Sequence, residues 1–97
     1  MPAYLLANVD VSNAEGYKEY VERNTPLVQN HGGRFVVRGG HVEVLEGEWV
    51  THRVVLIEFP NGDAARAWYN SPEYQAIAPI RQRNTRSGLL AIIESAA

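Results

Sequence analysis

The stretch that decides the fold is residues 32–40, which read Gly32-Gly33-Arg34-Phe35-Val36-Val37-Arg38-Gly39-Gly40. Its β-branched and aromatic residues favour a strand, and the glycine pair at each end permits the chain to turn there. A second apolar segment, residues 53–59, follows after a linker that contains Glu46 and Gly47. We expect the two segments to pair as a hairpin that forms the centre of an antiparallel sheet.

The segment before this hairpin predicts a strand and a helix. Residues 3–9 are almost wholly apolar, which is typical of a strand that is covered on both faces. Ser12 and Glu15 have the spacing of a capping box, so we expect the first helix to begin there. Pro26 removes a backbone donor and should kink or restart the helix, and Gly32 is well placed to end it in a left-handed turn.

The segment after the hairpin predicts two helical pieces and a last strand. Asn61 can cap the first piece. Ser71, followed by a proline, is a typical start for the second piece, because the missing N–H of the proline costs nothing at the first helical position. Residues 88–94 are again apolar and predict a strand without a clearly exposed face.

This order of elements predicts one α+β domain over residues 1–97, with a four-stranded antiparallel sheet and its helices on one face. The strands appear apolar on both sides, and the chain has no segment left to cover the second face. A domain of this size also buries a modest share of its surface when alone. We therefore expect a homodimer that packs sheet against sheet.

Composition narrows the range of partners. The net charge is -2, which offers no basic face for nucleic acid, and the absence of cysteine excludes disulfides and thiolate chemistry. No window approaches the roughly 18 apolar residues that span a bilayer, and the N-terminus lacks a basic region followed by an apolar run. The expectation is a cytoplasmic protein that binds neither nucleic acid nor membranes.

Several motifs together resemble one known family. They are Gly32-Gly33-Arg34-Phe35, Arg38-Gly39-Gly40, Leu45-Glu46-Gly47-Glu48-Trp49, Arg53-Val54-Val55-Leu56-Ile57-Glu58-Phe59-Pro60, Ala65-Arg66-Ala67-Trp68-Tyr69 and Ser71-Pro72-Glu73-Tyr74. In this order they resemble the domain of unknown function 1330 family, small bacterial proteins of the dimeric α+β barrel superfamily, from Tyr4 to Glu94. Asn61 stands where the resemblance predicts serine, and both residues cap helices.

The resemblance implies a ferredoxin-like βαββαβ protomer and a dimeric α+β barrel, but no reaction. More distant relatives of the fold include cofactor-independent monooxygenases, muconolactone-type isomerases, aromatic polyketide cyclases and heme-dependent enzymes. Several of them bind a small aromatic or phenolic substrate between the sheet and the helices. Transfer of chemistry at that distance rests on the fold alone.

Arg38 and Glu58 are the first candidates for chemistry. If the hairpin places them opposite one another, the arginine would bind a carboxylate or an enolate and the glutamate would act as a base. The alternative is an ion pair that fixes the strand register or a dimer interface. His31 is a further candidate base or heme ligand. The alternative is a structural role at the end of a helix, where the helix dipole favours a positive charge.

Aromatic side chains predict a pocket between helices and sheet. Tyr17, Tyr20, Trp68 and Tyr74 should face the sheet, and we expect Tyr20 and Trp68 to shape a ligand pocket. The alternative is that they belong to the hydrophobic core. Arg81 shares a helix side with Tyr74 and would close the pocket as an anion contact, or would form an outward salt bridge.

No metal or other cofactor is expected. The histidines at 31, 41 and 52 lack the spacing of metal ligands, and the glycine pairs do not form a phosphate loop. The hypothesis is a cofactor-independent enzyme for proton-transfer, isomerase, cyclase or monooxygenase chemistry on an aromatic or enolisable acid. The alternative is a non-catalytic, metabolite-binding or stress-associated dimeric module.

Overall fold

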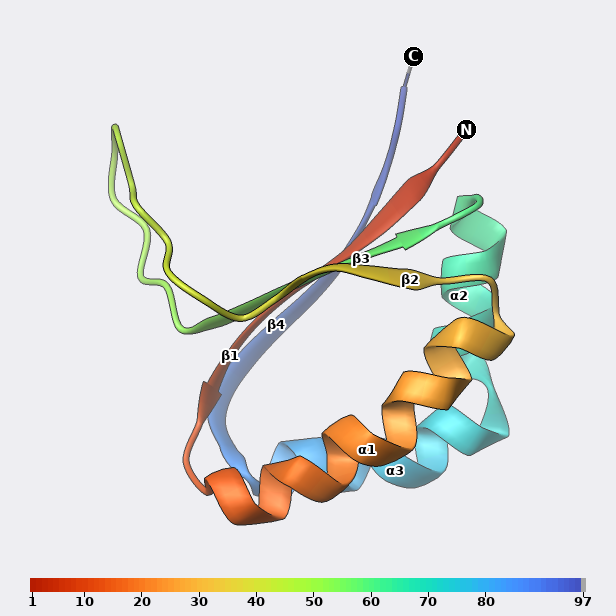
Figure 1. Ribbon diagram of the computed structural model, residues 1–97, viewed down its shortest axis with the longest axis horizontal. Helices are drawn as coiled ribbons and strands as arrows, with labels where there is room; N and C mark the ends of the chain where they lie inside the picture. Colours follow the sequence, from red (N-terminus) through yellow and green to blue (C-terminus); the bar gives the residue numbers. More distant parts are fainter. Residues whose placement is uncertain (97) are drawn as a thin grey trace.

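The computed structural model describes residues 1–96, which form a four-stranded antiparallel sheet with its helices on one face (Figure 1). In chain order the elements are β1 (Ala3–Val11), α1 (Ala14–Asn30), β2 (Arg34–Arg38), β3 (Arg53–Phe59), α2 (Gly62–Asn70), α3 (Pro72–Arg83) and β4 (Thr85–Glu94). The predicted α+β, ferredoxin-like βαββαβ fold is confirmed, with the second helical region divided at Ser71.

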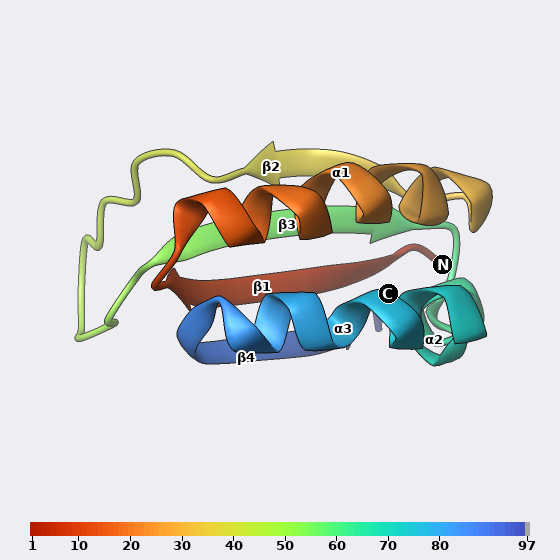
Figure 2. The ribbon, with the colours of Figure 1, turned by 90° about the horizontal axis from the view of Figure 1, so that it is seen from below.

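The strand order across the sheet is β2-β3-β1-β4 (Figure 2). Each neighbouring pair is antiparallel, so β1 and β3 are the inner strands. The expectation that the β2–β3 hairpin forms the centre of the sheet is wrong, because β2 is an edge strand and most of its residues are exposed. β1 instead links the two halves, since it pairs with β3 on one side and β4 on the other.

Residues of the inner strands alternate between the two faces of the sheet, as strand geometry requires. Leu5 pairs with Ile57, and both are buried under the helices. Leu6 pairs with Leu56, and both lie on the opposite face, which no element covers. The largest fully buried side chains of the core are Trp68, Tyr74, Phe59, Ile77, Val9 and Val28.

The helix ends follow the sequence signals with one exception. Asn13 caps α1 and accepts a hydrogen bond from the backbone N–H of Gly16, so the expected start at Ser12 is one residue early. The helix continues through Pro26 to Asn30 without restarting. Asn61 and Ser71 cap α2 and α3 as predicted, through the backbone N–H groups of the third residue beyond each.

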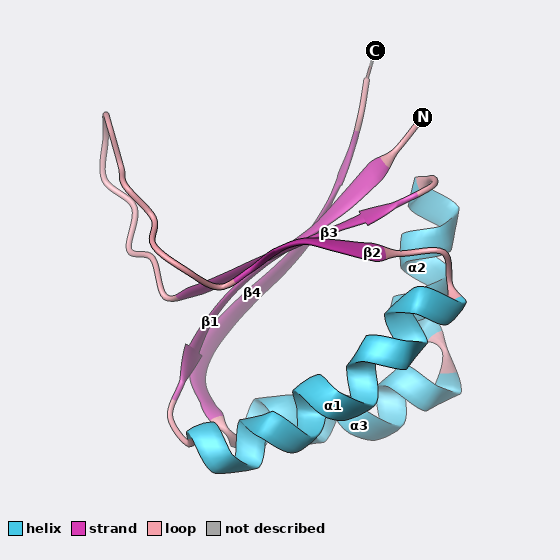
Figure 3. Cartoon of the chain, in the orientation of Figure 1, coloured by secondary structure: helices cyan, strands magenta, loops and turns pink. Residues whose placement is uncertain are grey.

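The connection between β2 and β3, residues 39–52, has no regular secondary structure and extends away from the helices (Figure 3). Asn8 of β1 fixes its end: the side-chain amide donates to the carbonyl of Val50 at 3.0 Å and accepts from the backbone N–H of His52 at 2.8 Å. Within residues 1–96, no helix combines the length and the apolar character required to cross a membrane.

Candidate functional site

A β-bulge in β2 decides which arginine faces the helices. Arg34 pairs with Glu58, but the register shifts at Val36, so that Arg38 lies opposite Val55. The expected pairing of Arg38 with Glu58 is therefore wrong. The partner of Glu58 is Arg34, whose guanidinium donates to the carboxylate at 2.9 Å on the uncovered face of the sheet. The extra residue turns Arg38 to the covered face.

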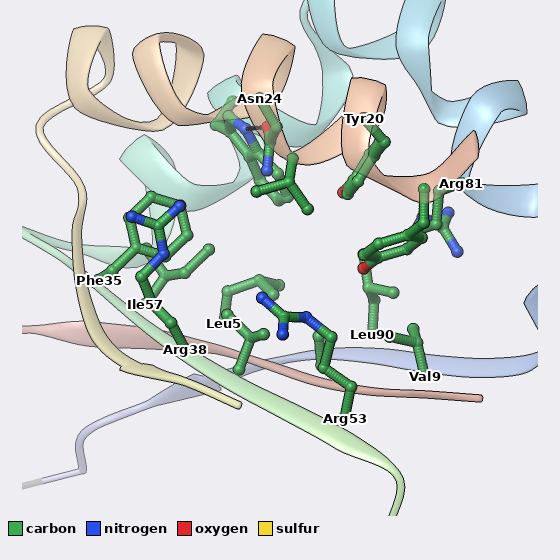
Figure 4. A pocket seen from close by; sticks show the side chains of 15 residues that line it. Leu5, Val9, Tyr20, Asn24, Phe35, Arg38, Arg53, Ile57, Arg81 and Leu90 are labelled. Atoms are coloured by element: carbon green, nitrogen blue, oxygen red, sulfur yellow. Dashed lines mark hydrogen bonds between the residues drawn. The ribbon is translucent and has the colours of Figure 1, made fainter. Parts of the chain in front are cut away.

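On that covered face, a cavity lies between the sheet and helices α1, α2 and α3 (Figure 4). We call it the inner cavity. The space open to the centres of water molecules is about 40 Å³, enough for about three of them. Most of the wall is apolar, and its polar members are Tyr17, Tyr20, Asn24, Arg38, Arg53, Trp68 and Arg81.

The charge of this wall has one sign. Arg38, Arg53 and Arg81 line the inner cavity, whereas no carboxylate and no imidazole of the described residues, 1–96, does. None of the three guanidiniums forms a salt bridge with a carboxylate of residues 1–96. Of the three residues, Arg81 is buried, Arg53 is partly buried and Arg38 is exposed. A buried positive charge without a counter-charge is costly, so the surroundings of Arg81 favour a ligand that brings negative charge.

Arg38 is held by two neighbours. Its guanidinium donates to the hydroxyl of Thr25 at 3.0 Å and stacks on the ring of Phe35 at 4.0 Å. The Thr25 hydroxyl in turn donates to the carbonyl of Val21. Because the hydrogen bond to Thr25 uses only one of the N–H groups of the guanidinium, other N–H groups of Arg38 remain free to bind a ligand.

Arg81 is almost fully buried, with an exposed fraction of 8%. Its Nε donates to the hydroxyl of Tyr74 at 3.3 Å, and that oxygen lies 2.9 Å from the hydroxyl of Tyr20. Burial lowers the pKa of Arg81, but the hydroxyls of Tyr74 and Tyr20 raise it more, so its pKa lies above the ordinary value. The guanidinium is therefore charged at neutral pH.

The phenols of the cavity are neutral at neutral pH. Burial raises the pKa of Tyr20 well above its ordinary range, and the neighbouring hydroxyl of Tyr74 raises it further. Burial also raises the pKa of Tyr17, although Arg53 and Arg81 oppose this shift. These hydroxyl groups act as hydrogen-bond donors rather than as bases.

Arg53, at the start of β3, carries the one buried side-chain polar atom without a partner among residues 1–96. That atom is its Nε. A buried donor without an acceptor costs about 1 to 3 kcal/mol, and a ligand oxygen or a water molecule at this point would remove the cost. The guanidinium passes close to Gly39, where an added Cβ would lie 2.8 Å from Nη1.

Trp68 and Asn24 form a buried pair across α2 and α1. The indole N–H donates to the side-chain carbonyl of Asn24 at 2.9 Å. Trp68 also contacts Phe59 and Tyr74 through its ring, with centroid distances of 5.9 and 4.3 Å. The pair fixes the end of the inner cavity that lies under α2.

The structure brings together five of the seven residues predicted for the site, and they are Tyr17, Tyr20, Arg38, Trp68 and Arg81. Glu58 lies on the other side of the sheet. His31 lies at the end of α1, where its Nδ1 is 2.8 Å from the carbonyl oxygen of Leu27. Neither residue lines the inner cavity.

Two polar residues of the wall, Asn24 and Arg53, were not predicted as site residues from the sequence. The first lies four residues after Tyr20, on the same side of α1, and the second alternates with Val55 and Ile57 on β3. Helical periodicity for the first and strand alternation for the second could have identified these residues from the sequence. Among residues 1–96, no group of three or more histidine, aspartate or glutamate side chains is placed to hold a metal ion.

The sequence matches a family model over residues 2–95, and the model describes a domain of unknown function, DUF1330. The chain belongs to the DUF1330 family. This match confirms the resemblance that the glycine and arginine motifs indicated. A comparison with curated proteins found no match.

Solved structures place this DUF1330 protein among ferredoxin-like folds. It is similar to a protein of unknown function from Rhodopseudomonas palustris, at 21% identity and a TM-score of 0.80 over 99% of this chain and 83% of that one. SnoaB, a cofactor-independent oxygenase from Streptomyces nogalater, is 13% identical, with a TM-score of 0.69 and coverage of 99% and 94%. A dimeric ferredoxin-like protein of unknown function from Jannaschia sp. CCS1 is 13% identical, with a TM-score of 0.64 and coverage of 98% and 100%. Identities this low establish the fold alone.

Proposed function

We propose that this DUF1330 protein binds the acidic head group of a small aromatic or enolisable organic acid in the inner cavity and acts on that acid without a metal or nucleotide. The composition of the wall of the inner cavity supports this proposal. Three arginine side chains line a mostly apolar cavity, and no carboxylate of residues 1–96 lies in its lining. A small site of this kind selects an anion with an apolar body.

The chemistry that suits this wall is stabilisation of an anion derived from the substrate. When a C–H bond next to a carbonyl group breaks, the electron pair moves to the oxygen as an enolate, and arginine donors stabilise that charge. Tyr17 and Tyr20 are protonated at neutral pH and line the same cavity. In this proposal the Tyr17 hydroxyl donates to the enolate oxygen, while the Tyr20 hydroxyl stays hydrogen-bonded to that of Tyr74. The released proton goes to water, because no carboxylate or imidazole lines the cavity.

A structural neighbour supports this reaction class. SnoaB is a cofactor-independent oxygenase on a similar fold, and an enzyme without a cofactor must draw its reactivity from the substrate itself. An enolate or phenolate held by arginines is such a reactive species. In this proposal Arg38 and Arg81 bind the negative charge, and Tyr20 with Trp68 shapes the apolar wall.

Hydrogen–deuterium exchange in D₂O tests the proposal. Phenylpyruvate, acetoacetate and 4-hydroxyphenylacetate are incubated with the protein, and NMR records loss of the C–H signal next to the carbonyl group. We expect accelerated exchange for at least one acid, and loss of the acceleration in Arg81→Gln. Exchange no faster than in buffer, for acids shown by calorimetry to bind, would contradict the enzyme assignment.

A second function, a metabolite-binding module without turnover, is favoured by a different observation. Within residues 1–96, the lining of the inner cavity holds no histidine, aspartate or glutamate, the residues that proton transfer commonly uses. A binding module predicts saturable calorimetric binding of organic acids together with exchange at the buffer rate. The same pair of measurements therefore separates the two functions.

We also infer that the protein is a homodimer formed through the uncovered face of the sheet. Val37, Leu89 and Ile93 on that face have exposed fractions of 40, 50 and 49%. Together with Leu6 and Leu56 they present an apolar surface of the kind that proteins cover with a partner. The dimeric protein from Jannaschia sp. supports a second copy as that partner.

A further inference from the structure

An open groove adjoins the inner cavity between α1 and the start of the β2–β3 connection. Its volume is about 550 Å³, by the same measure that gives about 40 Å³ inside. We call it the outer groove, and its walls come from Val11, Ala14, Tyr17, Lys18, Val21, Gly39, Gly40, His52 and Arg53. Tyr17, Val21 and Arg53 line both spaces, so the groove and the cavity are separated only by these side chains.

The size of the inner cavity limits what it can take. Room for about three water molecules accommodates a carboxylate or an enolate oxygen with its nearest carbons, but not a complete aromatic acid. An acid whose head group lies inside must therefore extend past Arg53 into the outer groove, which has ample space. The remainder of such a ligand is recognised there.

The outer groove presents positive charge. Lys18 and Arg53 line it, and no carboxylate from the described part of the chain does. Lys18 forms no salt bridge with a carboxylate of residues 1–96. Asp10 lies 3.9 Å from His52 and is bound by Arg86 at 3.1 Å. We therefore count His52 as a wall residue of the outer groove and not as one of its positive charges.

Arg53 lies where the two spaces meet. It belongs to both walls, and its buried Nε has no partner within residues 1–96. Gly39, with a φ of +79°, lets the backbone approach this guanidinium. An oxygen placed between cavity and groove would satisfy the free donor, while Lys18 lies further out on α1.

We propose that the outer groove is a second anion subsite and that the ligand is an elongated organic acid with two negative groups joined by an apolar body. One group binds inside to Arg38 and Arg81, and the other binds at the groove to Lys18, with Arg53 between them. This inference rests on the proposed function, because it assumes an acid in the inner cavity. Beyond the proposed function, this inference specifies that the ligand is elongated and carries two negative charges.

Isothermal titration calorimetry with two matched series tests the subsite. The dicarboxylates run from succinate to suberate, and the monocarboxylates from butyrate to octanoate. We expect one dicarboxylate to bind about fivefold more tightly than its monocarboxylate, the gain of one partly exposed charge pair. In Lys18→Gln this preference should disappear while monocarboxylate affinity stays constant. The control is Arg23→Gln, which removes an equal charge from the same helix at an exposed position paired with Glu19.

The outcomes separate the two proposals. A dicarboxylate preference that persists in Lys18→Gln, or that falls equally in Arg23→Gln, would overturn the second subsite. Equal affinity of the wild-type protein for both series would also overturn it and would leave the inner cavity as an acid site. If no member of either series binds, the proposed function fails together with this inference.

Discussion

The guanidinium of Arg38 lies 4.0 Å from the ring centre of Phe35, on the same face of β2, although the two residues are three apart in sequence. Simple alternation would put them on opposite faces. The bulge at Val36 adds one residue and brings both under the helices. One inserted residue thus decides that the inner cavity has a third arginine.

The first prediction concerns this arginine. Arg38→Gln should lower the affinity for an organic acid about tenfold, the loss expected when one charge-assisted contact is removed. Calorimetric titration with benzoate measures it. The matched control is Arg34→Gln, because Arg34 lies on the uncovered face and pairs with Glu58. Equal losses in both variants would show that net charge, and not the cavity, determines affinity.

Gly39→Ala should disturb Arg53. The new Cβ would lie 2.8 Å from Nη1, and the φ of +79° strains any residue with a side chain. We expect a loss of stability of about 1 to 3 kcal/mol, accompanied by weaker acid binding. Gly47→Ala is the control, since its φ is +88° and nothing lies within 4 Å of its added Cβ. It should show backbone strain with unchanged binding, and urea denaturation with titration of each variant checks both statements.

Trp68→Phe should destabilise the fold beyond the loss of ring contacts. It leaves the buried side-chain carbonyl of Asn24 without its donor, which costs about 1 to 3 kcal/mol. In a double-mutant cycle, Asn24→Ala should cost less in the Trp68→Phe background than in the wild-type protein. Free energies of unfolding from urea titrations measure the coupling, and strictly additive losses would refute it.

Alkaline pH should weaken the fold through Tyr20. Its native pKa is raised by burial, whereas in the unfolded chain it titrates near its ordinary value of about 10. Above that pH the unfolded chain loses a proton that the native chain keeps, so the free energy of unfolding falls as pH rises, by about 1.4 kcal/mol per pH unit for each such group. In Tyr20→Phe the slope should decrease by about one proton, and the remainder should come from Tyr17, whose pKa is also raised. Urea denaturation at a series of alkaline pH values gives the slope, and a slope unchanged in the variant would contradict this assignment.

Leu56→Glu should convert the dimer to a monomer. Leu56 lies opposite Leu6 in the middle of the uncovered face, and a carboxylate there would have to be buried in the interface. Ala76→Glu adds the same charge at an exposed position of α3 and should leave the dimer intact. Native mass spectrometry of both variants decides, and a wild-type protein that is monomeric at micromolar concentration would exclude the interface altogether.

Much of the fold was predictable because strong local signals agree with the global arrangement. The caps at Asn61 and Ser71 and the apolar segments near residues 3–9 and 53–59 each identify an element without reference to the rest of the chain. The order of strands was less accessible, because the apolar pattern of β2 is compatible with either an inner or an edge position. When a partner could cover an edge strand, its residues have the same apolar character in the sequence as those of an inner strand.

The site residues on the helices were predictable from the sequence, whereas those on the β2–β3 hairpin were not. Helical periodicity placed Tyr17, Tyr20 and Arg81 toward the sheet, and no insertion disturbs that period. On β2 the alternation rule failed at Val36, since a bulge depends on pairing with β3 and not on β2 alone. A slip of one residue exchanges the faces, which is why Arg38 lies beneath the helices, whereas Arg34, before the bulge, pairs with Glu58 on the uncovered face.

The alternation along β1 and β3 has an evolutionary consequence. Neighbouring residues such as Leu5 and Leu6, or Leu56 and Ile57, belong to different surfaces, one beneath the helices and one on the bare side of the sheet. Substitutions that reshape one surface therefore leave the chemical character of the other almost unchanged. Descendants of this chain can diversify what they recognise and how they assemble as two separate traits, whereas a one-residue insertion or deletion within a strand, such as the bulge of β2, exchanges the faces and would change both at once.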